Sequence, residues 1–244
     1  TVFEDNGSFE IEGHFIEEAN RPDDSITSWT LTEGFAYSLN VVFAQVGLQI
    51  GRETLEQRAA AYGIGATIPF DEPIPAGQLA STPEFLDSKA ALADTAFGQG
   101  ELLVTPMHMA MVVSAVANGG GAMRPYLVQS LSDADGKIVS TAEPEKWQAA
   151  IDQQTSDTMQ GLMVDAVEWG YAQAAILPGF RVGGKTGTAE SGGDIPHGWF
   201  IGFAGESEPR VAVAVLLEHG GEGGGYPAQI GAQLLSTALA LIPA

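Results

Sequence analysis

The chain has 244 residues and no cysteine, and its formal net charge is −21 because ten basic residues stand against 31 acidic ones. This charge argues against nucleic acid and against an anionic membrane surface as partners, since both would repel it. The lack of cysteine excludes disulfides and thiolate metal sites, and it fits an extracytoplasmic location. The longest apolar run, "VAVAVLL", is far shorter than the roughly 20 residues that a membrane helix needs.

The first part of the chain predicts a hairpin and two helices. Alternation in "SFEIEGHFI" predicts an edge hairpin within the first 24 residues, where no core element is evident. Apolar residues then recur at helical spacing from Thr32 to Val46, with a break at 38–40, until two glycines end the run. A second short helix is predicted over 53–62, and a proline-rich surface connection follows over 66–83.

The middle of the chain contains two further helices on either side of a hairpin. Thr105 can cap a helix that has Pro106 at its first position, and the glycine run at 119–121 ends it. Strand signals flank "DADG", which predicts a strand, a turn and a second strand. Another helix is predicted to open at Thr155 and to end at Gly170, with one apolar stripe along its length.

The last part of the chain predicts a sheet. Strands are expected over 180–188, 199–204 and 211–218, and a helix closes the chain after Pro227. A turn at "GESEP" joins the last two strands, and the three strands can form an antiparallel meander. Helices come first and the sheet comes later, which predicts an α+β fold in which helices flank an antiparallel sheet and a helical region is attached.

The stretch "GFRVGGKTGTAE" admits two interpretations. Up to Thr186 it matches G-x-x-x-x-G-K-T, the phosphate-binding loop of nucleotide hydrolases. From Lys185 onward it reads K-T-G-T, the strand motif of active-site serine acyl transferases. A phosphate loop needs an apolar strand before it and a helix directly after it. Pro178 and Gly179 precede this motif and the glycine-rich "GTAESGGDIPHG" follows it, which disfavours the nucleotide interpretation.

Four landmarks occur in an order that supports the acyl-transferase interpretation. They are "SLN" followed by "VVFAQVG", then "GQGELLVTPMHMA", "GGKTGTAE" and "HGWFIGFA". With these stretches the chain resembles the transpeptidase domain of penicillin-binding proteins, from about Val2 to the C-terminal helix. K-T-G alone would be weak evidence, but four landmarks at plausible separations are a strong signal.

The resemblance implies a role for each motif residue. Lys185 would attract the terminal carboxylate of a peptide, and Thr186 and Thr188 would donate hydrogen bonds to it. Gly187 would leave room for the ligand backbone, and the Thr188 backbone N–H would form half of an oxyanion hole. Ser38 would relay protons between the attacking serine and the leaving amine.

Asn40 would hydrogen bond the substrate amide and the general-base lysine, according to the same resemblance. Taken alone, Ser38 is a common residue at a helix break, Asn40 a common cap and Lys185 an ordinary strand lysine. Only their combination favours the catalytic interpretation.

One part of the family's pattern is missing from this sequence. The nucleophile of these enzymes is the serine of S-x-x-K, but three positions before the four lysines stand Leu86, Ala134, Glu143 and Val182. We expect that motif upstream of Thr1. The chain is then a single transpeptidase-like domain over 1–244, incomplete at its N-terminus and inactive by itself. Its helical region would span about 25–120 and its sheet region about 122–244.

The resemblance implies the remaining functional expectations. The substrate would be a peptidoglycan stem peptide ending in D-Ala-D-Ala, β-lactam antibiotics would bind, and neither a cofactor nor a metal would be needed. The complete protein would be extracytoplasmic, anchored to the membrane through a segment outside this chain, with proteins of cell-wall synthesis or division as partners. A non-catalytic binding or scaffold module on the same fold is the alternative.

Overall fold

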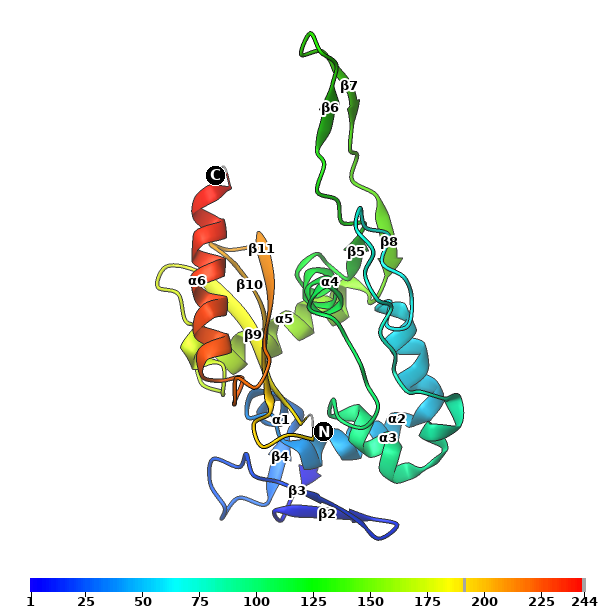
Figure 1. Cartoon of the computed structure of the whole chain (residues 1–244). Coiled ribbons are helices and arrows are strands. Elements are labelled where there is room, and N and C mark those ends of the chain that lie inside the picture. Colours follow the sequence, from blue (N-terminus) through cyan, green and yellow to red (C-terminus); the bar gives the residue numbers. More distant parts are fainter. Residues whose placement is uncertain (191, 243–244) are drawn as a thin grey trace.

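A three-stranded antiparallel sheet organises the fold, as the sequence predicts. The computed structural model describes residues 1–190 and 192–242. Its central sheet has the order β11-β10-β9, with β9 at one edge (Figure 1). The strands span β9 Arg181–Ala189, β10 His197–Gly205 and β11 Val211–Leu217. This meander, together with the helices around it, confirms the predicted α+β class.

Helices pack against this sheet and extend away from it. α6 packs along β10 and β11, α4 lies against β11, and α5 lies against β9 (Figure 1). α2 and α3 pack against each other. The α-helices span α1 Leu31–Ala36, α2 Asn40–Ala61, α3 Lys89–Ala96, α4 Pro106–Ala117, α5 Gln153–Glu168 and α6 Tyr226–Leu241, and two 3₁₀ helices span η1 Pro83–Asp87 and η2 Gln173–Ala175.

The remaining strands of the described residues form two-stranded pairs. These pairs are β1 Val2–Glu4 with β4 Ser28–Thr30, β2 Ser8–Ile11 with β3 His14–Glu17, β5 Gly121–Met123 with β8 Lys146–Ala149, and β6 Ser130–Ser132 with β7 Ile138–Thr141. β2–β3 and β6–β7 confirm the two predicted hairpins, and β6–β7 projects from the body of the molecule (Figure 1). The expectation that the first 24 residues hold no core element is wrong, because Phe3 in β1 and Ile16 in β3 are buried.

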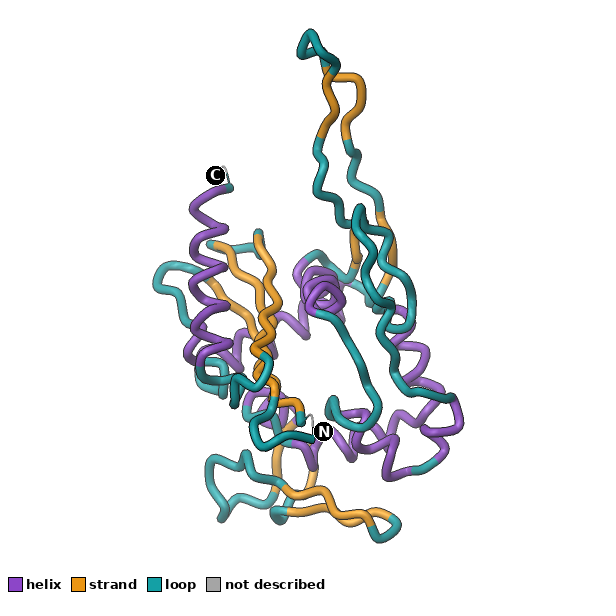
Figure 2. The backbone as a smooth tube through the Cα atoms, viewed as in Figure 1, coloured by secondary structure: helices purple, strands orange, loops and turns teal. Residues whose placement is uncertain are grey.

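Local sequence signals explain where the helices begin and bend. The Thr105 hydroxyl accepts a hydrogen bond from the His108 N–H at 3.1 Å, which caps α4 as predicted. α5 begins earlier than predicted, because Asp152 caps it by accepting from the Thr155 N–H at 2.7 Å. Within α2 the backbone leaves helical geometry at Gly51, where φ is 76°. The connection after α2 is mostly loop, in line with its prolines (Figure 2).

Glycines allow close approaches in the core. Phe200 of β10 has no exposed surface, and a Cβ on Gly231 of α6 would lie 2.2 Å from its ring. Gly184 of β9 also has no room for a side chain, since a Cβ there would lie 2.6 Å from the same ring. At Gly47 of α2 a Cβ would lie 2.2 Å from the Ala96 Cβ of α3. These contacts require glycine because atoms cannot approach so closely without displacing an element.

Substitution of Gly47 tests whether this close approach of α2 and α3 supports stability. Gly47→Ala should lower the free energy of unfolding by about 1–3 kcal/mol, because the added methyl group forces the two helices apart. Gly161→Ala is the matched control, because a Cβ there meets nothing within 4 Å on helix α5. It should raise stability by about 0.5–1 kcal/mol. Urea denaturation measures both effects, and equal stabilisation by the two changes would contradict the packing described here.

Candidate active site

Ser38 lies in the tight turn between α1 and α2. Its φ is 58°, a left-handed conformation that costs a non-glycine residue about 1–2 kcal/mol. The Ser38 N–H donates to the Phe35 carbonyl at 3.2 Å, and the Leu39 N–H donates to the Gly34 carbonyl at 2.8 Å. Leu39 is completely buried. Hydrogen bonds and burial on both sides of Ser38 therefore maintain its unfavourable conformation.

Aromatic side chains pack behind this turn. Tyr37 makes edge-to-face contacts with Trp29, Trp169 and Tyr171, at centroid distances of 6.1, 5.4 and 5.7 Å. Each such pair contributes about 0.5–1.5 kcal/mol beyond the burial of its surface. The Tyr171 N–H also donates to the Ala36 carbonyl at 3.0 Å. The end of α1 is thus attached to the segment that follows α5.

Lys185 of β9 reaches the Ser38 turn directly. Its Nζ donates to the Ser38 Oγ at 2.6 Å and to the Thr186 carbonyl at 2.8 Å. Nζ also lies 5.8 Å from the centroid of the Phe35 ring, a cation–π distance. Ser38 and Lys185, separated by 147 positions in the sequence, are therefore in direct contact.

The surroundings of Lys185 change its protonation. The residue as a whole is half-buried, but its ammonium group is surrounded by protein atoms. Desolvation by burial lowers the pKa of Lys185 from its ordinary value to about 8. Near neutral pH the group remains mostly protonated, and it loses its proton more readily than an exposed lysine.

Thr188 contacts two segments beside the end of β9. Its carbonyl accepts a hydrogen bond from the Gln99 Nε2 at 3.2 Å. Its hydroxyl accepts from the Gly223 N–H at 3.4 Å. Gln99 belongs to the "GQG" landmark, but the sequence analysis did not predict that its side chain contacts β9. Gly223 carried no signal except its place in a glycine-rich loop.

Thr186 and Gly187 lie next to each other on β9, and Asn40 begins α2. Thr186 pairs with Phe200 in the sheet, and Gly187 pairs with Trp199. A Cβ on Gly223 would lie 2.4 Å from the Gly187 carbonyl oxygen, so this glycine pair permits a close approach within the protein itself. No hydrogen bond joins the Asn40 side chain to Lys185 among the described residues.

The local structure excludes a phosphate-binding loop. Strand β9 runs from Arg181 to Ala189 through the whole G-K-T sequence. Lys185 is therefore in the middle of a strand, and the next element of the described residues is strand β10, not a helix that could direct N–H groups at a phosphate. The nucleotide interpretation of 179–186 is wrong.

The site therefore consists of an edge strand whose lysine contacts the serine of a turn between two helices. The family model of the penicillin binding protein transpeptidase domain matches residues 1–236. The chain belongs to this family.

Individual relatives agree with the family match. Peptidoglycan D,D-transpeptidase PbpA of Mycolicibacterium smegmatis is 39% identical over 219 residues, which cover 86% of this chain and 44% of the relative. PbpA of Mycobacterium tuberculosis is 37% identical with the same coverage. The chain thus spans less than half the length of these curated relatives.

Solved structures show the same fold. The D,D-transpeptidase domain of a peptidoglycan glycosyltransferase from Eggerthella lenta superposes with a TM-score of 0.89 at 33% identity, covering 99% of this chain and 60% of that one. Penicillin-binding protein A of M. tuberculosis, as its ceftriaxone acyl-enzyme complex, also has a TM-score of 0.89, at 31% identity, covering 98% of this chain and 56% of that one.

Residues 1–190 and 192–242 hold neither a cluster of metal ligands nor a helix suited to cross a membrane. They contain no group of three or more His, Asp or Glu side chains placed to hold a metal ion. They also contain no helix with the length and apolar character of a membrane span.

An NMR titration of the Lys185 side chain tests this description of the site. We expect a pKa of about 8, because burial disfavours the charged ammonium. The unfolded chain then binds more protons between about pH 8 and 10.4, so the free energy of unfolding should rise with pH across this window. Lys185→Met should remove that rise. A pKa near 10.4, the ordinary lysine value, would show that the ammonium is exposed to water.

Proposed function

We propose that this chain is the C-terminal portion of a D,D-transpeptidase. The complete protein cross-links peptidoglycan stem peptides that end in D-Ala-D-Ala, through a serine acyl-enzyme, and it binds β-lactams. The observation that carries the proposal is the 2.6 Å hydrogen bond from Lys185 to Ser38, within a chain of the transpeptidase family.

The contacts of Lys185 and Ser38 suit a proton relay and a carboxylate anchor. The Lys185 ammonium donates to the Ser38 hydroxyl oxygen, which leaves the hydroxyl hydrogen free to be passed on. A pKa of about 8 lets Lys185 carry charge near neutral pH and still exchange a proton. In a chain with a net charge of −21, this cation would lower the electrostatic cost of binding a substrate carboxylate.

Thr186 and Thr188 would hold that carboxylate through their hydroxyl groups. The Thr188 hydroxyl accepts its hydrogen bond from Gly223, so its own hydrogen remains available for a ligand. Thr186 lies two positions away on the same face of the strand. Gly187 between them adds no side chain to this edge.

The edge of β9 offers a donor for the oxyanion. The Thr188 carbonyl points away from β10, because it accepts from Gln99. In an antiparallel strand the N–H and C=O of one residue point to the same side, so the Thr188 N–H also faces the open edge. A donor there could stabilise the charge that develops on the carbonyl oxygen during acylation.

The chemistry requires a nucleophile that these residues lack. In the proposed reaction the serine of an upstream S-x-x-K motif attacks the carbonyl carbon of the penultimate D-Ala, and the terminal D-Ala leaves as an amine after receiving a proton. An amine of a second stem peptide then attacks the ester and releases the serine. Ser38 would carry the proton to the leaving amine, and Asn40 would orient the substrate amide.

Related observations support the wider setting. The ceftriaxone complex of penicillin-binding protein A is an acyl-enzyme, which supports β-lactam binding. The relatives are peptidoglycan D,D-transpeptidases, which supports an extracytoplasmic, membrane-anchored protein with partners in cell-wall synthesis or division. A scaffold module on the same fold is the alternative, and it would have no upstream nucleophile.

Lys185→Ala tests the proposed function in a protein extended upstream through the S-x-x-K serine. Acylation by penicillin should slow by about tenfold or more, because a hydrogen bond to a charged group contributes about 1.5–3 kcal/mol. The melting temperature should barely change. Stopped-flow measurement of acylation with a fluorescent penicillin gives the rate.

Lys137→Ala is the matched control, because Lys137 lies in the exposed β6–β7 turn and should leave the rate unchanged. The 244-residue chain without the extension should not be labelled covalently. Covalent labelling of that chain, or normal acylation of the Lys185→Ala protein with a large fall in melting temperature, would count against the proposal.

A further inference from the structure

The segment that follows β3 contacts the Ser38 turn at the Ser38 carbonyl, whereas the sheet contacts it at the Ser38 hydroxyl. Glu18 is buried, with 8% of its surface exposed, and its own N–H donates to the Gly7 carbonyl at 2.9 Å. Two residues earlier, Ile16 packs with Val41 of α2 in one buried cluster. The hairpin β2–β3 is thereby fixed against α2, and Glu18 is brought to the N-terminus of that helix.

The Glu18 carboxylate caps α2. Its Oε2 accepts from the Val41 N–H at 3.0 Å, and its Oε1 accepts from the Asn20 N–H at 3.0 Å. The neighbouring Asn40 N–H also acts to lower the pKa of this carboxyl. The residue in the N-cap position, Leu39, has no polar side chain. A residue 21 positions upstream of Leu39 therefore satisfies one of the free N–H groups at the start of the helix.

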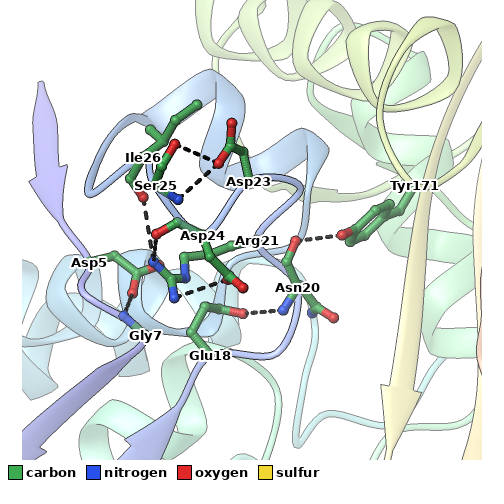
Figure 3. A network of polar contacts seen from close by, with 10 residues as sticks. All are labelled: Asp5, Gly7, Glu18, Asn20, Arg21, Asp23, Asp24, Ser25, Ile26 and Tyr171. Carbon is green, nitrogen blue, oxygen red and sulfur yellow. Dashed lines mark hydrogen bonds and ion pairs between the residues drawn. The ribbon is translucent and has the colours of Figure 1, made fainter.

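Asn20 links the same segment to Ser38 itself. Its Nδ2 donates to the Ser38 carbonyl at 3.0 Å. Its own carbonyl accepts from the Tyr171 hydroxyl at 2.5 Å (Figure 3). Figure 3 also shows Glu18 reaching the Asn20 backbone, so a chain of hydrogen bonds runs from Glu18 through Asn20 to Tyr171. The backbone of Ser38 is thus held by a donor that belongs to neither flanking helix.

The buried Glu18 carboxylate depends on its backbone N–H donors, so the side chain has little freedom to move. Burial raises the pKa of the Glu18 carboxyl above its ordinary value, and nearby Asp5 acts in the same direction. The backbone N–H donors oppose both effects. Asp5 is itself buried, and its Oδ2 has no hydrogen-bond partner among the described residues. A carboxylate in such a place loses its compensation if the N–H groups of α2 move away.

We propose that Glu18 and Asn20 are positioning residues that keep the Ser38 hydroxyl within reach of Lys185. The catalytic meaning of this proposal rests on the proposed transpeptidase function. Ser38 has an unfavourable left-handed backbone. The turn can relax to a more favourable conformation once the Asn20 hydrogen bond to the Ser38 carbonyl, or the Glu18 cap of α2, is lost. Displacement of a relay group by about 1 Å is enough to slow a reaction strongly.

The test compares Glu18→Gln and Asn20→Ala with Glu17→Gln. Glu18→Gln removes the charge that caps α2, and Asn20→Ala removes the donor to Ser38 without changing any charge. Glu17→Gln is the matched control, because Glu17 is the exposed neighbour at the end of β3. If Glu18→Gln does not fold, Asn20→Ala decides the question. The first measurement is the pKa of Lys185 by NMR in the 244-residue chain.

In both test variants the pKa of Lys185 should rise from about 8 toward about 10.4, because a loosened turn admits water to the ammonium. The second measurement is penicillin acylation of the extended protein, which should slow by about fivefold or more. The control should match the wild type in both. An unchanged pKa in the variants, or an unchanged acylation rate, would overturn the proposal and leave these residues with a purely structural role.

The two measurements separate this inference from the proposed function. If the unmodified extended protein is not acylated at all, the transpeptidase proposal fails and the catalytic part of the inference fails with it. The titration of Lys185 still shows whether Glu18 and Asn20 hold the turn. If the extended protein is acylated normally, and the variants show the same acylation rate and the same pKa of Lys185, only the inference about Glu18 and Asn20 fails.

Discussion

The hydrogen bond between Lys185 and Ser38 joins the strand and the turn on which the proposed chemistry depends. The donor is the Lys185 ammonium, which is poorly hydrated. The acceptor is Ser38, whose backbone is in an unfavourable conformation. Neither feature would persist in isolation, because each costs free energy. The surrounding structure must therefore fix both the strand and the turn, and much of the fold can be understood from this requirement.

The strand and the turn are fixed by different means. β9 is held by its pairing with β10 and by close approaches at glycines, where Gly184 faces the ring of Phe200 and Gly187 faces Gly223. The turn is held by aromatic packing around Tyr37 and by polar contacts from the segment that follows β3. Packing gives the strand its rigidity, whereas hydrogen bonds from distant residues give the turn its conformation.

The sequence could predict the elements whose signals are local. The cap and proline of α4 and the three strands of the sheet were predicted because their signals lie within the elements themselves. The pair β1–β4 was missed because three residues give too little alternation to recognise. Motifs predicted Ser38 and Lys185 as site residues, and their contact is consistent with that prediction. Glu18 was not predicted, because a cap supplied from 21 positions before Leu39 leaves no periodic or motif signal.

The most direct measurement is a crystal structure of the extended protein acylated by penicillin. Our account predicts that the ligand carboxylate lies within about 3 Å of the Thr186 and Thr188 hydroxyls. The ester carbonyl oxygen should point at the Thr188 N–H, and the Lys185 to Ser38 hydrogen bond should persist. An acyl group whose carboxylate lies away from β9, or a Lys185 turned away from Ser38, would contradict the assignment of this site.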